Sequence, residues 1–374
     1  MIQLIYLIIG LILTIIAFSG FASIIRFNDI MVYFSGVAGI IYIFLHRKND
    51  YKLISPQINI IVTLGCIIEF IYLLLDYSNI TQILNYVTLF GVIIGVKLLS
   101  LLKWEKMNWF FSGTILWIAS WILIQMFLPE HTLSGWNPNS SIGIVPVSIC
   151  ALSLIYCSKG KLNLFIFLTG VILTLLPIIE LKNRSAMFAI VAFGVIALPP
   201  VWKVFNSKHI FRCFYIGILL FNVMLPFHYK DIESTDTMEN ALEISQEVTE
   251  KDKGYNDREE LWDIGREILQ EAPILGHAGQ RDIYLHNFSI DVLTQFGWLG
   301  WIIFAIMYCS LMERCYRYNS KFNIFLFGFG CVLLLNSFEN VLFACNVFSI
   351  FPYILFAIPW RLLILGKRKS LSFL

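Results

Sequence analysis

Long apolar runs alternate with short polar connections along most of this chain. A helix that crosses about 30 Å of hydrocarbon needs about 20 mainly apolar residues, because lipid offers no hydrogen bonds to the backbone. The runs predict twelve membrane spans, near residues 3–25, 29–46, 57–75, 79–99, 108–128, 141–157, 162–180, 184–200, 210–228, 288–312, 322–338 and 341–363. The pattern therefore predicts an all-α polytopic membrane protein with about 12 transmembrane helices, and no repeat period is visible.

Composition supports a membrane rather than a soluble protein. Hydrophobic residues make up 58% of the chain and charged residues only 14%, and the mean hydropathy is +0.75, values too apolar for a soluble domain. All eight cysteines fall in predicted spans or at their cytoplasmic ends, and no Cys/His spacing resembles a zinc site. The first run lacks a basic start and a small-residue cleavage site, so we expect an uncleaved anchor.

Basic residues collect in alternate connections, as they do where connections face the cytoplasm. The predicted cytoplasmic connections hold Arg47, Lys48, Lys52, Lys97, Lys103, Lys106, Lys159, Lys161, Lys203, Lys208, Arg212, Arg314, Arg317, Lys321, Arg361, Lys367, Arg368 and Lys369. The short connections on the other side hold only Arg26, Lys182 and Arg184. This bias predicts that both termini are cytoplasmic.

One long polar segment, 229–287, interrupts the apolar pattern and is predicted to lie outside the cytoplasm. It holds 15 of the 25 carboxylates, against six basic residues. The segment divides the chain into 1–228 with nine spans, the external segment 229–287, and 288–374 with three spans and a cytoplasmic tail. The role of its acidic front half, 231–252, is not indicated by any motif.

The second half of this segment predicts an amphipathic helix on the membrane surface or on the helical bundle. Apolar residues recur at helical spacing at Leu261, Trp262, Gly265, Ile268, Leu269 and Ala272. Asn256 can cap the helix and Pro273 stops it. Arg258, Trp262 and Arg266 lie at i, i+4 and i+8, so two guanidinium groups flank one indole. The alternative is a solvated face with intrahelical ion pairs.

Further candidate residues lie at the mouths of predicted spans. Arg184 opens the span near 184–200 on the external side, where it either snorkels to water or binds an anion such as phosphate. His286 and Asn287 open the next span after the external segment, shortly after Arg281. Imidazole changes charge near neutral pH and can accept a proton from a sugar hydroxyl. We expect His131, His228 and His277 to be structural.

The order of these motifs resembles the superfamily of O-antigen polymerases and O-antigen ligases, over about residues 180–302. The shared elements are Asn183-Arg184-Ser185-Ala186, Arg258 with Trp262, Pro273 with Gly276, His286-Asn287, and Gly297 with Gly300. The fold implied is that of helical membrane glycosyltransferases of the C type, with an external loop over a cavity.

The resemblance implies glycosyl transfer from a polyprenyl-pyrophosphate-linked oligosaccharide, without metal or other cofactor, at the outer face of the bacterial inner membrane. Arg184 and Arg258 would stabilise the pyrophosphate, with Arg281 as a further candidate, and His286 would act as the base. Trp262, Arg266 and Asn287 are the remaining candidates for substrate binding. The bilayer is an expected partner and a chain-length regulator protein a further one, whereas nucleic acid is not expected.

Alternatives remain open at this point. A polymerase extends the glycan on its lipid carrier, a ligase passes the finished glycan to lipid A-core, and the motifs favour the polymerase only slightly. A metal-linked glycosyltransferase with an acid in the first external loop would rely on Asp29. A flippase for lipid-linked sugars would need ionisable groups deep in several spans, where Glu69 is the clearest case.

Overall fold

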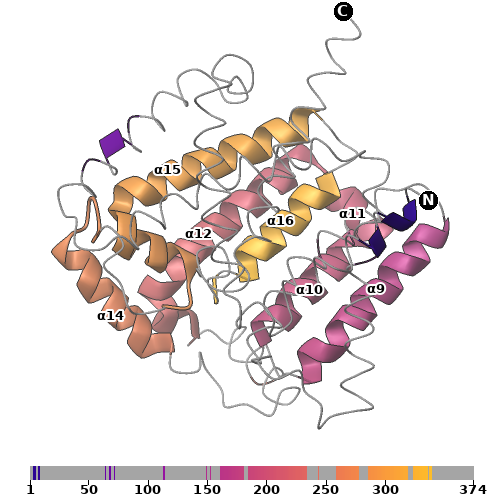
Figure 1. Ribbon diagram of the computed structural model, residues 1–374, viewed down its shortest axis with the longest axis horizontal. Helices are drawn as coiled ribbons and strands as arrows, with labels where there is room; N and C mark the ends of the chain where they lie inside the picture. Colours follow the sequence, from indigo (N-terminus) through magenta and orange to yellow (C-terminus); the bar gives the residue numbers. More distant parts are fainter. Residues whose placement is uncertain are drawn as a thin grey trace, which may run out of the picture.

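The computed structural model describes residues 161–180, 184–233, 258–277, 285–318, 323–335 and 337–338, together with isolated positions elsewhere. All regular elements in these ranges are α-helices (Figure 1). They are α9 (Lys161–Glu180), α10 (Arg184–Ala197), α11 (Pro199–Phe205), α12 (Lys208–Glu233), α14 (Arg258–Glu271), α15 (Phe288–Tyr318) and α16 (Asn323–Leu335).

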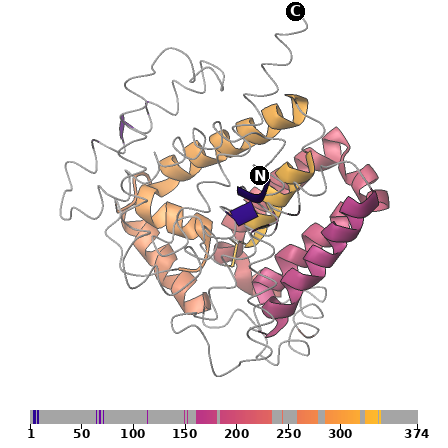
Figure 2. The same ribbon diagram turned by 45° about the vertical axis from the view of Figure 1, so that its right-hand side comes forward.

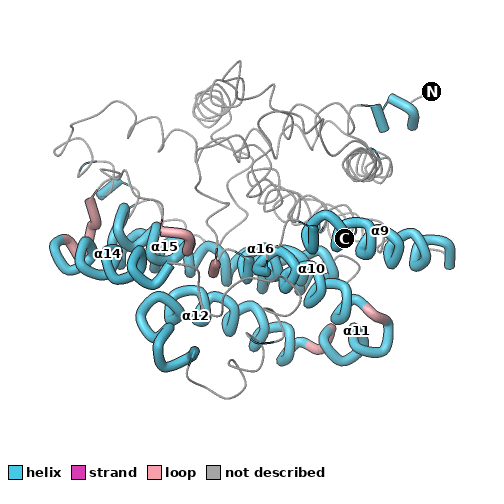
Figure 3. The backbone as a smooth tube through the Cα atoms, turned by 90° about the horizontal axis from the view of Figure 1, so that it is seen from below, coloured by secondary structure: helices cyan, strands magenta, loops and turns pink. Residues whose placement is uncertain are grey.

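The helices pack in a row with one helix laid against it. Seen from below (Figure 3), α14, α15, α16, α10 and α9 form the row, and α12 lies against one face of it. Neighbours along the row are in contact, and α12 contacts α14, α15 and α16. α14 and α9 therefore lie on opposite sides of the bundle, as Figures 1 and 2 both show.

Four of the predicted apolar runs are confirmed as helices in the described part of the chain. The predicted runs 162–180, 184–200, 210–228 and 322–338 coincide closely with α9, α10, α12 and α16. The predicted amphipathic helix is α14, which buries Trp262, Gly265 and Leu269 and packs on the bundle. The run at 341–363 and the runs before 160 lie outside the continuously described ranges, so a total of twelve spans stays a prediction.

By length and composition alone, two described segments are apolar enough to cross a membrane, Lys208–Asp231 and Phe288–Ser310, of which the second is broken at Gly297. The pair Arg184–Ala197 and Pro199–Phe205 is bent by 90° and adds a third if it forms one span. Pro199 and Pro200 cause this bend, because proline begins a helix readily but cannot continue one. By their length and apolar composition, these segments favour a helical membrane protein.

Exposed apolar stripes run along the same helices at spacings of three or four residues or a multiple of them. The stripe residues are Phe165, Leu168, Ile172 and Ile179 on α9, Phe188, Val191 and Val195 on α10, and Ile216, Leu220 and Met224 on α12. In water such faces would have to be covered, whereas lipid tails solvate them without cost. The stripes fit a bilayer environment.

An aromatic cluster holds the middle of the bundle. The ring of Phe327 on α16 lies 4.4 Å from Phe214, 6.0 Å from Trp202 and Phe205, and 6.2 Å from Phe193, measured between centroids. Three other helices, α10, α11 and α12, thus meet around one side chain of α16. Because the end of α10 and α11 both lie near the start of α16, α10 and α16 run antiparallel.

The span predicted at 288–312 is not one straight helix, and the reason is Gly297. Its dihedrals, φ 63° and ψ −169°, lie in a region that essentially only glycine occupies. The chain folds back here, since Trp301 Nε1 donates to Ser289 Oγ at 3.0 Å. Twelve residues of straight helix would separate these residues by about 18 Å. α15 is therefore a hairpin of a half-helix, 288–296, and a longer helix, 298–318.

The turn after α14, residues 273–277, fits into this break. Trp298 N donates to Pro273 O at 2.9 Å, Leu299 N to Ile274 O at 3.1 Å, and His277 N to Thr294 O at 2.9 Å. A Cβ on Gly276 would come within 2.5 Å of the backbone at Gln295. The two motif glycines, Gly276 and Gly297, thus permit a backbone-to-backbone contact that joins α14 to α15.

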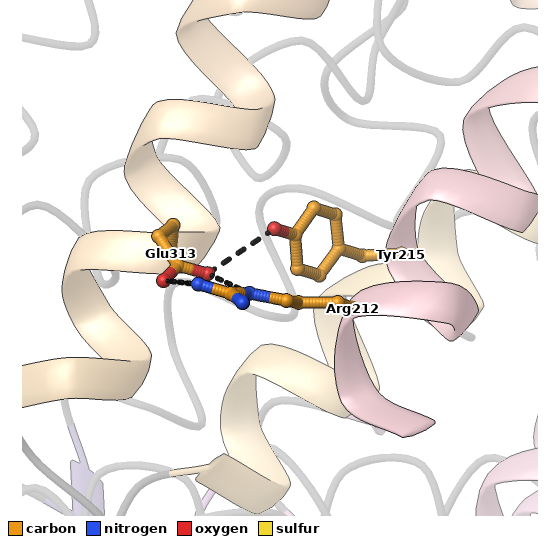
Figure 4. A network of polar contacts seen from close by, with 3 residues as sticks. All are labelled: Arg212, Tyr215 and Glu313. Atoms are coloured by element: carbon orange, nitrogen blue, oxygen red, sulfur yellow. Dashed lines mark hydrogen bonds and ion pairs between the residues drawn. The ribbon is translucent and has the colours of Figure 1, made fainter. Parts of the chain in front are cut away.

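At the opposite end of the bundle, an ion pair joins α12 to α15 (Figure 4). The guanidinium of Arg212 binds both carboxylate oxygens of Glu313, with Nε at 2.8 Å from Oε2. Tyr215 Oη donates to the same carboxylate at 3.4 Å. Lys203 and Lys208, which the charge pattern predicts to be cytoplasmic, lie at this end too. Which end faces the cytoplasm stays a prediction.

Candidate functional site

His286 has an unusual backbone conformation among the described residues. Its φ is 52°, in the left-handed region that residues with a Cβ seldom adopt, and no other described residue except glycine has a positive φ. Such strain persists only where the surroundings impose it, and it is concentrated at functional sites. The side chain is half-buried. The neighbours of His286 on both sides show what imposes the strain.

Leu285, on one side, is fully buried and both of its backbone groups are bonded. Its carbonyl accepts from Trp262 Nε1 on α14 at 2.9 Å, and its N–H donates to Asp291 Oδ1 at 3.4 Å. Asp291 is itself 2% exposed in the first turn of the half-helix. Trp262 is also completely buried. Its indole therefore ties α14 to the segment that carries His286.

Asn287, on the other side, is fully buried and caps the half-helix. Its Oδ1 accepts from Ile290 N at 3.0 Å, which is the usual N-cap bond. Its Nδ2 donates to Asn222 O at 3.1 Å and to Ser337 O at 2.8 Å. One amide thus joins α12, α15 and the end of α16. These bonds use both amide hydrogens, so Asn287, predicted to bind substrate, holds the site together in this structure.

Asn222 of α12 completes the anchoring from within an apolar helix. Pro226, four residues on, has no N–H, so the carbonyl of Asn222 lacks its usual helical donor and accepts from Asn287 instead. The Asn222 Oδ1 accepts from Ser289 N at 3.0 Å, and its Nδ2 donates to Leu333 O at 3.1 Å. Leu333 O is available because α16 ends at Leu335.

The fold-back at Gly297 also changes the depth of His286. Phe288 lies against Phe304, with ring centroids 4.5 Å apart, so the half-helix begins beside the middle of the longer helix. His286 therefore lies about 6–10 Å further into the bundle than the turn at Gly297. The sequence predicted a place at the outer mouth of a span, and this depth in a membrane stays a prediction. Within the bundle, the helix break turns the start of the apolar run toward the middle of the longer helix.

The arginines of α14 differ in their surroundings. Arg266 forms an ion pair with Asp263 one turn earlier, and its guanidinium lies 5.8 Å from the centre of the Tyr229 ring. Tyr229 Oη in turn donates to Asp263 at 3.3 Å. An intrahelical pair was the predicted alternative for Arg266, with a different acid as partner. Arg258 is the first residue of α14 and half-buried.

The remaining arginines are not brought to one place by the described contacts. Arg184 is the first residue of α10 and half-buried. Since α10 and α16 are antiparallel, Arg184 lies at the same end of this helix pair as Leu335. Ser337, two residues after Leu335, accepts the hydrogen bond from Asn287. Arg281 lies outside the described residues, as do Asp29 and Glu69. Among the described residues, no group of three His, Cys, Asp or Glu side chains is arranged to hold a metal ion.

Two histidines that the sequence predicted to be structural lie close to neighbouring residues. His277 Nε2 lies 3.1 Å from Ile268 O near the end of α14, which agrees with a structural histidine. His228, predicted to be structural too, lies 3.4 Å from Asp231. Sequence reasoning missed Asn222. An asparagine in an apolar run, followed after four residues by proline, was the available signal, because buried polar groups in spans require partners.

No protein-family model matches this chain, and no curated protein matches it.

Proposed function

We propose that the protein polymerises lipid-linked oligosaccharide repeat units of O-antigen or capsule. In this reaction a sugar hydroxyl of the acceptor attacks the anomeric carbon of a glycan on polyprenyl pyrophosphate. The bond from this carbon to the pyrophosphate oxygen breaks, and the pyrophosphate lipid leaves with the negative charge. The hydroxyl proton passes to His286. Both substrates are lipids with large polar heads, which fits an enzyme built from membrane helices.

The observation that carries this proposal is the strained backbone of His286 between two anchored neighbours. A base must be held within hydrogen-bonding reach of the proton that it removes, and general base catalysis contributes typically 10²–10⁴-fold in rate. The bond from Trp262 to the Leu285 carbonyl holds the imidazole segment against α14, the helix that begins with Arg258, and the bond from Asn287 to Asn222 holds it against α12. An arginine near the leaving oxygen stabilises the charge that develops on the pyrophosphate.

Replacement of the proposed base tests the mechanism. His286→Asn is the sharpest variant, because asparagine tolerates a left-handed backbone and yet cannot act as a base. Expressed in the native host, it should abolish the ladder of surface glycan on a gel while the protein remains in the membrane. His209→Ala, an exposed histidine at the opposite end of the bundle, is the matched control and should leave the ladder intact. An unchanged ladder for His286→Asn would remove the mechanism.

The arginines are tested in the same assay. Arg258→Ala and Arg184→Ala should each collapse the ladder, whereas Lys208→Ala, a surface cation at the opposite end, should not. The gene deletion decides between polymerase and ligase. Glycan with a single repeat unit on the cell surface identifies a polymerase. Loss of all attached glycan, with polymer retained on the lipid carrier, identifies a ligase that uses the same chemistry.

A further inference from the structure

We infer that Asn222 is a positioning residue for His286. Asn222 acts through its bonds to Asn287 and Ser289, and the bond to Asn287 depends on the missing N–H of Pro226. Its effect on transfer rests on the proposed function, whereas its effect on the imidazole does not. Asn222 contacts the His286 segment at two points, its carbonyl at Asn287 Nδ2 and its Oδ1 at Ser289 N. These contacts flank the backbone that follows His286.

The strength of the anchoring decides whether Asn222 can hold a strained residue. A left-handed backbone in a residue with a Cβ costs about as much as one or two net hydrogen bonds provide. Asn222 supplies two bonds through its side chain and a third through its carbonyl, and it is completely buried. Without the side chain, the buried N–H of Ser289 loses its partner and the start of the half-helix loosens.

Pro226 determines which donor the carbonyl of Asn222 accepts from. In an uninterrupted helix, the N–H of residue 226 would bond to the carbonyl of Asn222 and would compete with Asn287. Proline removes this competitor without removing any atom of Asn222. A proline in the interior of an apolar helix is otherwise a cost to stability. Its presence four residues after a buried asparagine is therefore explained by the bond that it leaves to Asn287.

Two variants separate positioning from general destabilisation. Asn222→Ala removes the two side-chain bonds. Pro226→Ala keeps them, restores a helical N–H and favours helix formation, so it should not lower the melting temperature. Asn206→Ala is the matched control, since Asn206 also joins two helices through an asparagine amide, that of Asn323 at 2.6 Å, at the opposite end of the bundle.

Chemical footprinting of the histidines gives a readout that needs no substrate. The purified protein is treated with diethyl pyrocarbonate, and mass spectrometry follows the modification rate of each of the six histidines. We expect the rate at His286 to change by at least about threefold in both variants, because Asn222→Ala removes the bond to Ser289 N and Pro226→Ala supplies an N–H that competes with Asn287 for the Asn222 carbonyl. The rates at His209 and His277 should stay the same, as should all rates in Asn206→Ala. An unchanged His286 rate in both variants would refute the positioning role.

Transfer kinetics test the catalytic consequence. Since the Asn222 side chain is completely buried and is bonded to Ser289 N and Leu333 O, Asn222→Ala should lower kcat by about tenfold to a hundredfold and leave the KM for the lipid-linked donor unchanged. If His286→Asn abolishes transfer and Asn222→Ala leaves kcat intact, the catalytic consequence is wrong. If the footprint changes but His286→Asn leaves transfer unaffected, the positioning of His286 stands and the proposed function fails.

Discussion

Gly297 offers the most direct test of the fold around the candidate site. We consider Gly297→Ala, which adds one methyl group where α15 folds back on itself. A Cβ at this position would lie 2.2 Å from Ile274 O and 2.3 Å from Ile274 C. Both are backbone atoms, so no side chain can rotate to make room. The 273–277 turn has to move away from α15.

The expected loss of stability follows from what the displaced turn gives up. Three backbone hydrogen bonds join the turn to α15, and each contributes about 0.5–1.5 kcal/mol net. If the chain also keeps its fold-back, alanine occupies a region that costs a residue with a Cβ about 1–3 kcal/mol. We therefore expect the free energy of unfolding to fall by about 2–5 kcal/mol.

Thermal unfolding in detergent, followed by tryptophan fluorescence, measures this loss. For a chain of this size the melting temperature should fall by about 2–6 °C, with all variants compared at one scan rate. Gly217→Ala on α12 is the matched control, since nothing lies within 4 Å of a Cβ there. Alanine in place of glycine on an exposed helix should keep or raise the melting temperature. Equal melting temperatures for the two variants would refute the close approach of the turn to Gly297.

Two further predictions concern stability. A double-mutant cycle with Arg212→Gln and Glu313→Gln should give a favourable coupling that declines as salt is added, because the Arg212 side chain is 33% exposed. Coupling independent of salt would contradict this reasoning. Trp262→Phe should lower the free energy of unfolding by about 1–3 kcal/mol, because it leaves the buried carbonyl of Leu285 without its donor. Trp298→Phe, at an exposed position, is the control and should have little effect in the same melting assay.

Several features of the bundle were predictable because each depends on neighbours in the sequence. Apolar runs predicted α9, α10, α12 and α16 to within a few residues, since a helix satisfies its own backbone wherever it lies. The spacing of Trp262, Gly265 and Leu269 predicted the buried face of α14. Pro273 predicted its end. The motif glycines marked places where the backbone needs freedom, although the sequence did not indicate that Gly276 and Gly297 touch each other.

The arrangement around His286 depends on contacts between residues far apart in the chain, and these have no signature in a local pattern. The polarity of Asn287 is compatible with substrate binding, yet its amide is used by carbonyls of Asn222 and Ser337. The apolar run from 288 predicted one crossing, because hydropathy does not register the direction of the chain, whereas the dihedrals of Gly297 reverse it.

The sequence by itself thus determined that the described part of the chain is helical, that its helices are apolar enough for a membrane, and where α9, α10, α12, α14 and α16 lie to within a few residues, because hydropathy and helix-stop residues act over one or two turns. The tertiary structure alone decided that α15 is a hairpin and that His286 is turned inward between two anchored neighbours. The physical reason is that the carbonyl groups freed at Pro226 and at the end of α16 find their donors only when distant segments pack together.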